Sequence, residues 1–400
     1  MRALLALVVT VSATACTPED FPEETVVDRL RVLGVSSSPA DLRPGETARL
    51  TSLVLDPTRP GQGTTTFWIG CDPDPFNLNR SVCSDPAVID DPAALGDMTM
   101  LPAGVKFIGL NAQAAYTAPA GLFGVLAADD PQRTLGTVGQ VLGISIAEEV
   151  NPAASMEELR AVFARVQSRE VRSLVSLFRV RISEDPERNT NPRVSKLLVA
   201  GEEWPAGARL MVRPGGKLPL DVDAPDEAFE PFTAQTPTGA EARTERILVA
   251  WYSTGGRFSE SRTAMREGVK TVFTAPGAKP FDPIPERRAG SLWTVLRDTR
   301  GGLSWSEFSF FVCDDALPVP QVTRIRPLSS RGDAVTVEGA ELGSVLDVIV
   351  GGVALRRGRA DATGTTWEGE LDPAVPAGVQ PVVVHTRRCE RLERGTLVVP

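Results

Sequence analysis

Apolar and polar side chains alternate with a period of two along much of this chain. Residues 29–35 and 292–297 alternate in this way, and residues 306–312 form a third run that is rich in aromatic side chains. Such runs are typical of half-buried β-strands. Gly, Pro, Asp and Asn separate the runs at intervals of roughly ten to twenty residues, which favours a β-sandwich over alternating strands and helices. We therefore expect an all-β fold.

The landmarks between these strands occur twice, in the same order and with different spacing. Four matches in register indicate two copies of one scaffold whose loops differ in length. Trp68 and Trp251 occupy the position where immunoglobulin-like sandwiches bury a tryptophan on a central strand, so we expect both in cores. The matching segments are 42–45 and 212–215 (Arg-Pro-Gly turns), 66–68 and 249–252 (tryptophan strands), 116–119 and 273–276 (Thr-Ala-Pro), and the Asp-Pro loops 130–136 and 282–290.

Residues 155–168 break the strand pattern. Ser155 followed by Glu158 forms a capping-box signature, so the sequence predicts a helix that begins after Ser155. We expect this helix to pack over an open end of the first sandwich, with a membrane-binding helix as the alternative. The residues at helical spacing are Met156, Leu159, Val162, Phe163 and Val166.

The C-terminal part of the chain follows the proline-rich linker 318–320 and has different motifs. Val-Thr-Val-Glu-Gly at 335–339 precedes a strand that ends in Val-Gly-Gly at 350–352. Over residues 320–399 these motifs resemble the IPT/TIG family of immunoglobulin-like modules. The resemblance implies a small all-β domain that serves as a spacer or interaction module, often on bacterial surfaces.

The two larger units resemble the PKD-like or immunoglobulin-like repeats of bacterial surface lipoproteins. The resemblance rests on the Arg-Pro-Gly turns, the tryptophan strands, the Thr-Ala-Pro segments and residues 297–302, and it implies no catalytic residue. We expect three immunoglobulin-like β-sandwich domains in tandem, with the helix as an insertion in the first. The predicted boundaries are 1–15 (signal peptide), 16–27 (acidic tether), 28–190, 191–316 and 319–400 (IPT/TIG-like).

The first sixteen residues have the features of an export signal. Arg2 precedes the apolar run 3–11, which is shorter than the roughly 20 residues that span a bilayer, and Ala13-Thr14-Ala15 then precedes Cys16. This arrangement resembles the bacterial lipoprotein signal, which implies acylation of Cys16 and a lipid anchor in the cell envelope, at the outer membrane of a Gram-negative bacterium. The alternative is a plain secretory signal that is cut after Ala15. The acidic segment 17–24 has little to bury and suits a tether.

The remaining cysteines are even in number, as expected for an oxidising compartment. Cys71 and Cys83 flank a short loop rich in Asp, Pro and Asn, so we predict a disulfide between them. Elimination then pairs Cys313 with Cys389, which would link the second domain to the third. A zinc site is the alternative, although the cysteines lack paired C-x-x-C spacing.

Composition and motifs exclude several functions. A net charge of −9 and a pI near 5.0 argue against nucleic acid as a partner, because phosphate binding needs a basic surface. His385 is the single histidine, which removes most histidine-based metal sites and catalytic triads. Phosphate loops, nucleophile elbows and zinc-protease helices are missing, so we expect no enzyme and no cofactor. Two acidic loops, around Asp72 and Asp221, are expected to be solvated rather than to hold calcium.

Two functions remain open at this stage. The first is a non-enzymatic envelope lipoprotein whose sandwiches contact other envelope proteins, in adhesion or envelope assembly. The second is a carbohydrate-binding or carbohydrate-processing accessory lipoprotein that recognises surface polysaccharide. A glycan site would need exposed aromatic side chains, and the tryptophans expected outside the cores are Trp204, Trp305 and Trp367.

Overall fold

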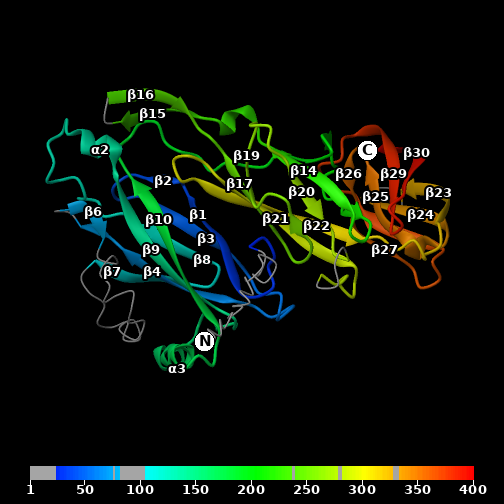
Figure 1. The fold of residues 1–400 in the computed structure, drawn as a ribbon, viewed down its shortest axis with the longest axis horizontal. Helices are drawn as coiled ribbons and strands as arrows, with labels where there is room; N and C mark the ends of the chain where they lie inside the picture. Colours follow the sequence, from blue (N-terminus) through cyan, green and yellow to red (C-terminus); the bar gives the residue numbers. More distant parts are fainter. Residues whose placement is uncertain (1–23, 75–76, 82–103, 237–238, 278–281, 328–332) are drawn as a thin grey trace, which may run out of the picture.

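The structure is a computed structural model that describes residues 24–74, 77–81, 104–236, 239–277, 282–327 and 333–400. Within these ranges, most strands form three pairs of facing sheets, which follow one another along the long axis (Figure 1). The all-β, immunoglobulin-like fold expected from the alternating pattern is confirmed. The signal segment, Cys16 and most of the predicted tether lie outside the described residues, and the domain boundaries themselves stay predictions.

The first sandwich pairs a three-stranded sheet with a five-stranded sheet. The smaller sheet has the order β1 (Arg31–Ser38), β3 (Thr47–Leu55), β8 (Gln113–Thr117). The larger sheet has the order β2 (Asp41–Leu42), β10 (Ser173–Ile182), β9 (Thr137–Ile146), β4 (Thr65–Cys71), β7 (Val105–Leu110). A short ribbon of β5 (Pro73–Asp74) and β6 (Asn77–Ser81) follows β4.

The second sandwich repeats this strand order and adds one strand at each edge of the sheet that has three strands in the first sandwich. One sheet has the order β12 (Glu202–Glu203), β11 (Lys196–Val199), β14 (Lys217–Asp223), β20 (Thr271–Thr274), β18 (Arg257–Phe258). The other has the order β13 (Leu210–Val212), β22 (Leu303–Val312), β21 (Ala289–Arg297), β17 (Leu248–Ser253), β19 (Arg262–Ala264). A separate hairpin, β15 (Pro231–Thr236) and β16 (Gly239–Thr244), leaves the sandwich between β14 and β17.

The third sandwich has the strand order of an immunoglobulin domain. Its sheets are β23 (Gln321–Pro327), β24 (Ala334–Ala340), β28 (Thr366–Glu370), β27 (Arg356–Ala360) and, opposite, β26 (Val353–Ala354), β25 (Val345–Val350), β29 (Gly378–Thr386), β30 (Arg391–Val399). The helical segments among the described residues are α2 (Pro131–Leu135), α3 (Met156–Gln167), η3 (Asp226–Ala228) and η4 (Leu342–Ser344).

The repeat seen in the sequence corresponds to equivalent positions in the first two sandwiches. Thr117 lies opposite Thr47, and Thr274 lies opposite Lys217, so the Thr-Ala-Pro segments pair with the strands that follow the Arg-Pro-Gly turns. Trp68 on β4 and Trp251 on β17 are both fully buried, as expected. One Asp-Pro loop forms the short helix α2, because Asp130 caps it by accepting the N–H of Gln132.

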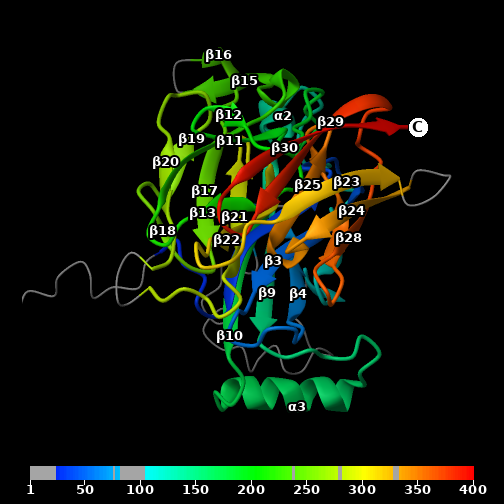
Figure 2. The same ribbon diagram turned by 90° about the vertical axis from the view of Figure 1, so that its right-hand side faces the viewer.

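The helix predicted after Ser155 is present as α3. Ser155 accepts the N–H of Glu158, and the Glu158 carboxylate accepts the N–H of Ser155, which completes the capping box. The helix extends beyond the ends of β9 and β10 (Figure 2). Its apolar side chains pack on the outer face of the larger sheet, where the ring centroids of Phe163 and Phe67 are 4.6 Å apart. The larger sheet thus has apolar side chains on both faces: one face contacts the sandwich core, and the other contacts the helix.

The first two sandwiches are in direct contact. Ser36 on β1 donates a hydrogen bond of 2.6 Å to the carbonyl of Leu303 on β22. Beside it, a Cβ atom on Gly34 would lie 2.9 Å from a Leu303 methyl carbon, so the close approach of the two sandwiches depends on glycine here. The N-terminal segment is held as well, since Val27 donates to the carbonyl of Ser253 at 2.7 Å.

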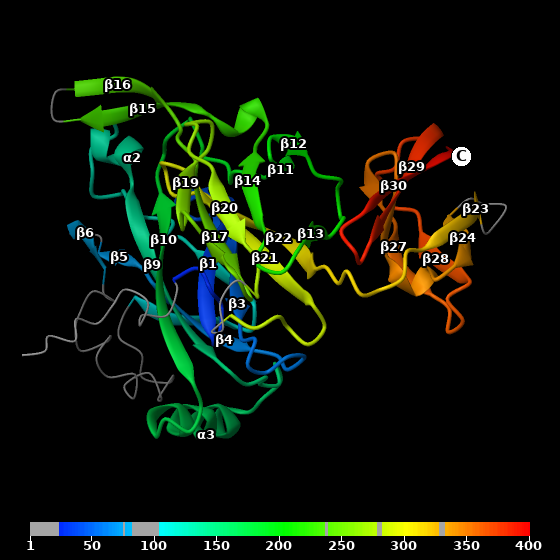
Figure 3. The same cartoon turned by 45° about the vertical axis from the view of Figure 1, so that its right-hand side comes forward.

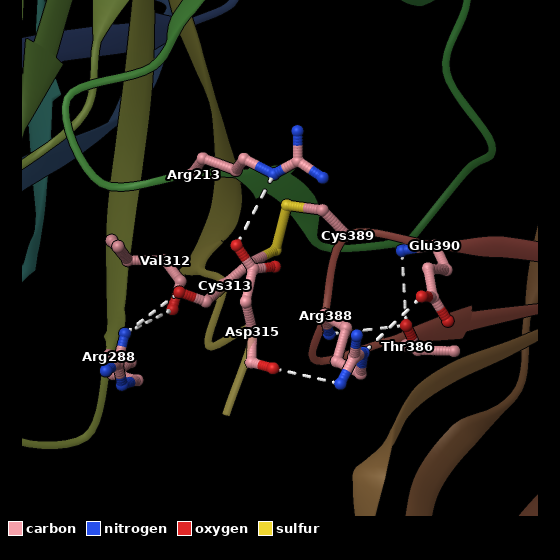
Figure 4. The surroundings of a disulfide bond; sticks show 9 residues. All are labelled: Arg213, Arg288, Val312, Cys313, Asp315, Thr386, Arg388, Cys389 and Glu390. Atoms are coloured by element: carbon pink, nitrogen blue, oxygen red, sulfur yellow. Dashed lines mark hydrogen bonds and ion pairs between the residues drawn. A yellow bond between two sulfur atoms is a disulfide. The ribbon is translucent and has the colours of Figure 1, made fainter. Parts of the chain in front are cut away.

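The second and third sandwiches are joined by a disulfide and an ion pair. Cys313 and Cys389 form a disulfide with a Cα–Cα distance of 5.6 Å, the pairing that elimination left. Arg388 next to it donates to the carbonyl of Asp315 at 2.9 Å (Figure 4). Cys71 is disulfide-bonded too, but Cys83 lies outside the described residues, so the Cys71–Cys83 pair stays a prediction.

The ion pair between Arg209 and Asp347 is the most constrained contact of this junction. The backbone N–H of Arg209 donates to Asp347 Oδ2 at 2.9 Å, and the guanidinium donates to Oδ1 at 2.9 and 3.1 Å. Asp347 is 7% exposed, and Trp204 packs beside it with its ring centroid 5.3 Å from that of the buried His385. This contact therefore fixes the orientation of the third sandwich.

Arg209→Ala is expected to lower the free energy of unfolding by about 3 kcal/mol, because it leaves the buried Asp347 carboxylate without its cation. Urea denaturation followed by tryptophan fluorescence, with the disulfide intact, measures this loss. Arg213→Ala is the control, since its ion pair with Asp315 is 3.9 Å long and highly exposed, and a change within about 0.5 kcal/mol is expected. Equal midpoints for the two variants would contradict the assignment.

Candidate functional site

A groove of about 820 Å³ lies between the first and second sandwiches. Its floor is formed by the start of β9 and the end of β10, and its wall by residues 297–301, which end β21 and turn toward β22. The β15–β16 hairpin lies close to α2, near this end of β10 (Figure 3). The groove is therefore built from segments far apart in the sequence.

Arginine is the charged residue that lines the groove; no acidic residue is among its lining residues. Arg181 pairs with Asp41 at 2.7 Å and with Asp185 at 3.2 Å. Arg179 and Arg297 also line the groove, and neither guanidinium has a hydrogen-bond or ion-pair partner in the ranges that the structure describes. The groove thus offers two uncompensated positive charges in a chain whose net charge is −9.

Arg300 links the groove to a buried acidic cluster beneath it. Its Nε donates to Glu245 at 2.6 Å, a second nitrogen donates to Glu230, and its side chain is 9% exposed. The guanidinium also lies 5.4 Å from the ring centroid of Phe232 on β15, so the hairpin contacts the groove wall through this residue.

Asp298 shapes the turn that carries Arg300. Its carboxylate accepts the N–H groups of Arg300 and Gly302 at 2.9 and 2.8 Å, and the side-chain amide of Asn189 at 3.2 Å. A Cβ on Gly302 would lie 2.1 Å from this carboxylate, so glycine is required there. Burial raises the pKa of Asp298, and these hydrogen bonds oppose the rise. The sequence predicted a turn at residues 300–302, and the structure has a turn there.

Glu245 is the most buried member of the cluster, with 1% of its side chain exposed. Burial raises its pKa to about 7; the hydrogen bond from Arg300 opposes the rise, and the charge of Asp298 adds to it. Two carboxylates, Glu230 and Glu245, share one guanidinium, which explains why the charged form of Glu245 is poorly compensated.

The tryptophans expected outside the cores lie in three different settings. Trp367 was expected to be exposed, and this was wrong: it is 2% exposed and packs in the core of the third sandwich, beside glycines at positions 358 and 369. Trp305 is partly buried on β22. Trp204 is partly buried as well and lines a pocket of about 420 Å³ with Phe308, Glu203 and Glu307. The structure therefore does not bring the three together.

Where the structure describes the acidic loops, several of their carboxylates form ion pairs. Asp72 pairs with Lys106 at 2.9 Å, and Asp223 and Asp226 both pair with Arg266. Within the described ranges, no group of three or more His, Cys, Asp or Glu residues is placed to hold a metal ion. No helix there is long and apolar enough to cross a membrane.

The groove arginines were missed at the sequence level. Leu177, Arg179 and Arg181 alternate with buried Val180 and Ile182, so their common face was readable from the strand pattern. The approach of residues 297–301 to that face was not, because it depends on how two sandwiches pack.

Comparison with known proteins gives no family assignment. No protein-family model matches the chain. No curated protein matches it either. Among solved structures, the chain aligns with one described as a crystal structure with a xylogluco-oligosaccharide, at 11% identity and a TM-score of 0.17, over 92% of this chain and 59% of that one.

Two further structures show similarity of the same order. The Bacteroides ovatus protein SGBP-B of a mixed-linkage glucan utilization locus, in complex with a heptasaccharide, aligns at 12% identity and a TM-score of 0.16, over 93% of this chain and 71% of that one. The human desmocollin-1 ectodomain aligns at 11% identity and a TM-score of 0.19, over 94% and 59%. We draw nothing about function from similarity at this level.

Replacing Glu245 by Gln is expected to change how stability depends on pH. The folded-state pKa of about 7 lies above the ordinary value of 4.5, so the contribution of protonated Glu245 is complete below about pH 4.5 and is lost as the pH rises to about 7. The wild type should therefore lose stability relative to Glu245→Gln over this interval, as measured by urea denaturation from pH 4.5 to 8.

The control for this measurement is Glu267→Gln. Arg246 lowers the pKa of Glu267 below 4.5, so its contribution is complete above that value and is lost only at lower pH. The difference between Glu267→Gln and the wild type should stay constant from pH 5.5 to 8. A constant difference for Glu245→Gln over the same range would contradict the assignment.

Proposed function

We propose that this chain is an exported, non-enzymatic lipoprotein, anchored through Cys16, that contacts other envelope proteins through the arginine groove. The observation that carries the proposal is that the guanidiniums of Arg179 and Arg297 have no ion-pair partner among the described residues and line a groove without acidic lining residues. In an otherwise acidic protein, such a site favours a carboxylate-bearing partner.

Preorganisation supports binding at this site. The turn that presents Arg297 and Arg300 is held by Asp298, and β1 is packed against β22 beside it. A partner that enters the groove would therefore lose little free energy to ordering the walls.

The position of the N-terminal segment supports the anchor. Thr25 and Val27 are hydrogen-bonded to Ser253 at the end of β17. A tether that runs from a lipidated Cys16 would reach the protein beside Ser253, which pairs with Leu292, whereas the groove lies at Arg297. The anchor and the groove would therefore lie at opposite ends of β21.

The proposal predicts two separable results in one experiment. Cells that produce the full chain are labelled with radioactive palmitate, crosslinked with formaldehyde, and the chain is immunoprecipitated. The wild type should carry label and a crosslinked envelope protein. Cys16→Ala should lose the label, and Arg179→Glu/Arg297→Glu should keep the label and lose most of the crosslinked partner.

Arg324→Glu/Arg394→Glu is the matched control, because both residues are exposed on the third sandwich, far from the groove in sequence. It changes the net charge by the same amount and should keep label and partner. Label that persists in Cys16→Ala would contradict the anchor. A partner that is retained in the groove variant at the wild-type level would contradict the contact function of the groove.

A second candidate function is carbohydrate binding at the Trp204 pocket. Trp204 Nε1 donates to the carbonyl of Ala208 at 3.1 Å, which fixes the indole, and Glu307 is an exposed carboxylate that lines the same pocket. An aromatic ring beside a hydrogen-bond acceptor suits recognition of a sugar ring.

This second function predicts that the full chain binds polysaccharide and that Glu307→Ala weakens binding about tenfold by removing a charged acceptor. Titration of surface polysaccharides by isothermal calorimetry measures this. Trp305→Phe, at a partly buried position of β22 that does not line the pocket, is the control. Absence of binding to every polysaccharide tested, or full binding by Glu307→Ala, would rule this function out.

A further inference from the structure

β10 has a free edge over most of its length. It pairs with β9 along all of Ser173–Ile182, but on its other side β2 pairs only with Arg181 and Ile182. Over Ser173–Val180, no strand of the described residues pairs with that side. The backbone N–H and C=O groups that point away from β9 there are a template for another strand.

The middle of this edge is apolar and exposed. Leu174, Val175 and Leu177 are 38%, 57% and 49% exposed. On β9, the partners of Val175 and Leu177 are Ile144 and Leu142, which are buried in the core cluster that includes α3. A strand edge that is protected against pairing usually carries a charge or proline in its middle, and here the middle carries neither.

Unpaired arginines lie at both ends of the edge. A second groove, of about 680 Å³, lies at Ser173 and Leu174 and is lined by Arg169 and Arg172. The arginine groove described above lies at the other end, with Arg179 and Arg297. None of these four guanidiniums has an ion-pair partner within the described ranges. The only acidic residue that lines the second groove, Asp28, pairs with Arg29.

We propose that β10 accepts an extended segment of the partner protein as an added strand. The segment has apolar side chains in its middle and a carboxylate near each end, and the inference rests on the proposed contact function. The free edge from Ser173 to Val180 spans about 23 Å at 3.3 Å per residue, so a segment of about eight or nine residues covers it. Main-chain hydrogen bonds provide the affinity, and the arginines at the two ends select the acidic partner.

A second copy of this chain is a poorer occupant than an acidic segment. If two β10 edges paired with each other, arginines of one copy would approach arginines of the other, and like charges in paired strands are destabilising. A polysaccharide has no backbone amides to complete the ladder. The apolar middle with positive ends is complementary to a peptide of the opposite charge.

The test uses synthetic nine-residue peptides and the full chain. The probe has alternating Val and Thr with Glu at both ends; a second peptide has Lys in place of Glu, and a third is the Glu peptide N-methylated at alternate residues. Fluorescence anisotropy is expected to show the Glu peptide binding at least about tenfold tighter than the Lys peptide, because like-charge juxtaposition is costly. N-methylation should abolish binding, because it removes the ladder donors.

Variants of the protein complete the test. Arg179→Glu/Arg297→Glu should abolish the preference between the Glu and Lys peptides, because Arg169 and Arg172 still favour Glu at the other end of the edge. Arg324→Glu/Arg394→Glu should leave the preference unchanged. Hydrogen exchange should show protection of the amides of residues 173–180 when the Glu peptide binds. Equal binding of the Glu and Lys peptides by the wild type, binding that survives N-methylation, or a dimer of the free chain that competes with the peptide would overturn the inference.

These results separate the inference from the proposed function. A crosslinked envelope partner that depends on Arg179 and Arg297, together with no peptide binding, would leave the contact function standing and overturn strand addition alone. If the wild type carries neither label nor crosslinked partner in the cellular experiment, the proposed function is overturned, whatever the peptides show.

Discussion

The packing of β1 against the β21–β22 hairpin is the contact on which the rest of the functional region depends. Along β21, Leu292 and Leu296 belong to the core of the second sandwich, while Trp293 and Val295 alternate with them and are nevertheless 4% and 6% exposed. Both faces of this strand are therefore buried. Gly34 permits the approach, because any side chain there would meet Leu303.

This packing creates the groove and sets its charge. It brings the turn that carries Arg297 and Arg300 up to the end of β10, where Arg179 and Arg181 already share one face. Glu230 and Glu245 of the acidic cluster pair with Arg300, whereas Arg179 and Arg297 have no ion-pair partner in the part of the chain that the structure describes. Positive charge thus remains where a ligand has access, while the compensating carboxylates are buried behind the wall.

Much of the architecture was predictable because it depends on local rules. The alternating pattern gave the strands, the Arg-Pro-Gly and Thr-Ala-Pro matches gave the internal repeat, and Ser155 with Glu158 gave the start of α3. Trp367 was misplaced, because Gly358 and Gly369 leave room around its indole, and that room is visible only in the folded third sandwich.

The sequence by itself determined the alternating strand pattern, the internal repeat and the pairing of Cys313 with Cys389, because periodicity, turn residues and cysteine number act over short distances or by count. The tertiary structure alone decided which charges are free. Arg179 and Arg181 look alike in the sequence, yet Arg181 reaches Asp41 and Asp185 while Arg179 reaches neither. Whether an arginine is neutralised depends on whether another element places a carboxylate beside it, and that placement depends on how the sandwiches pack.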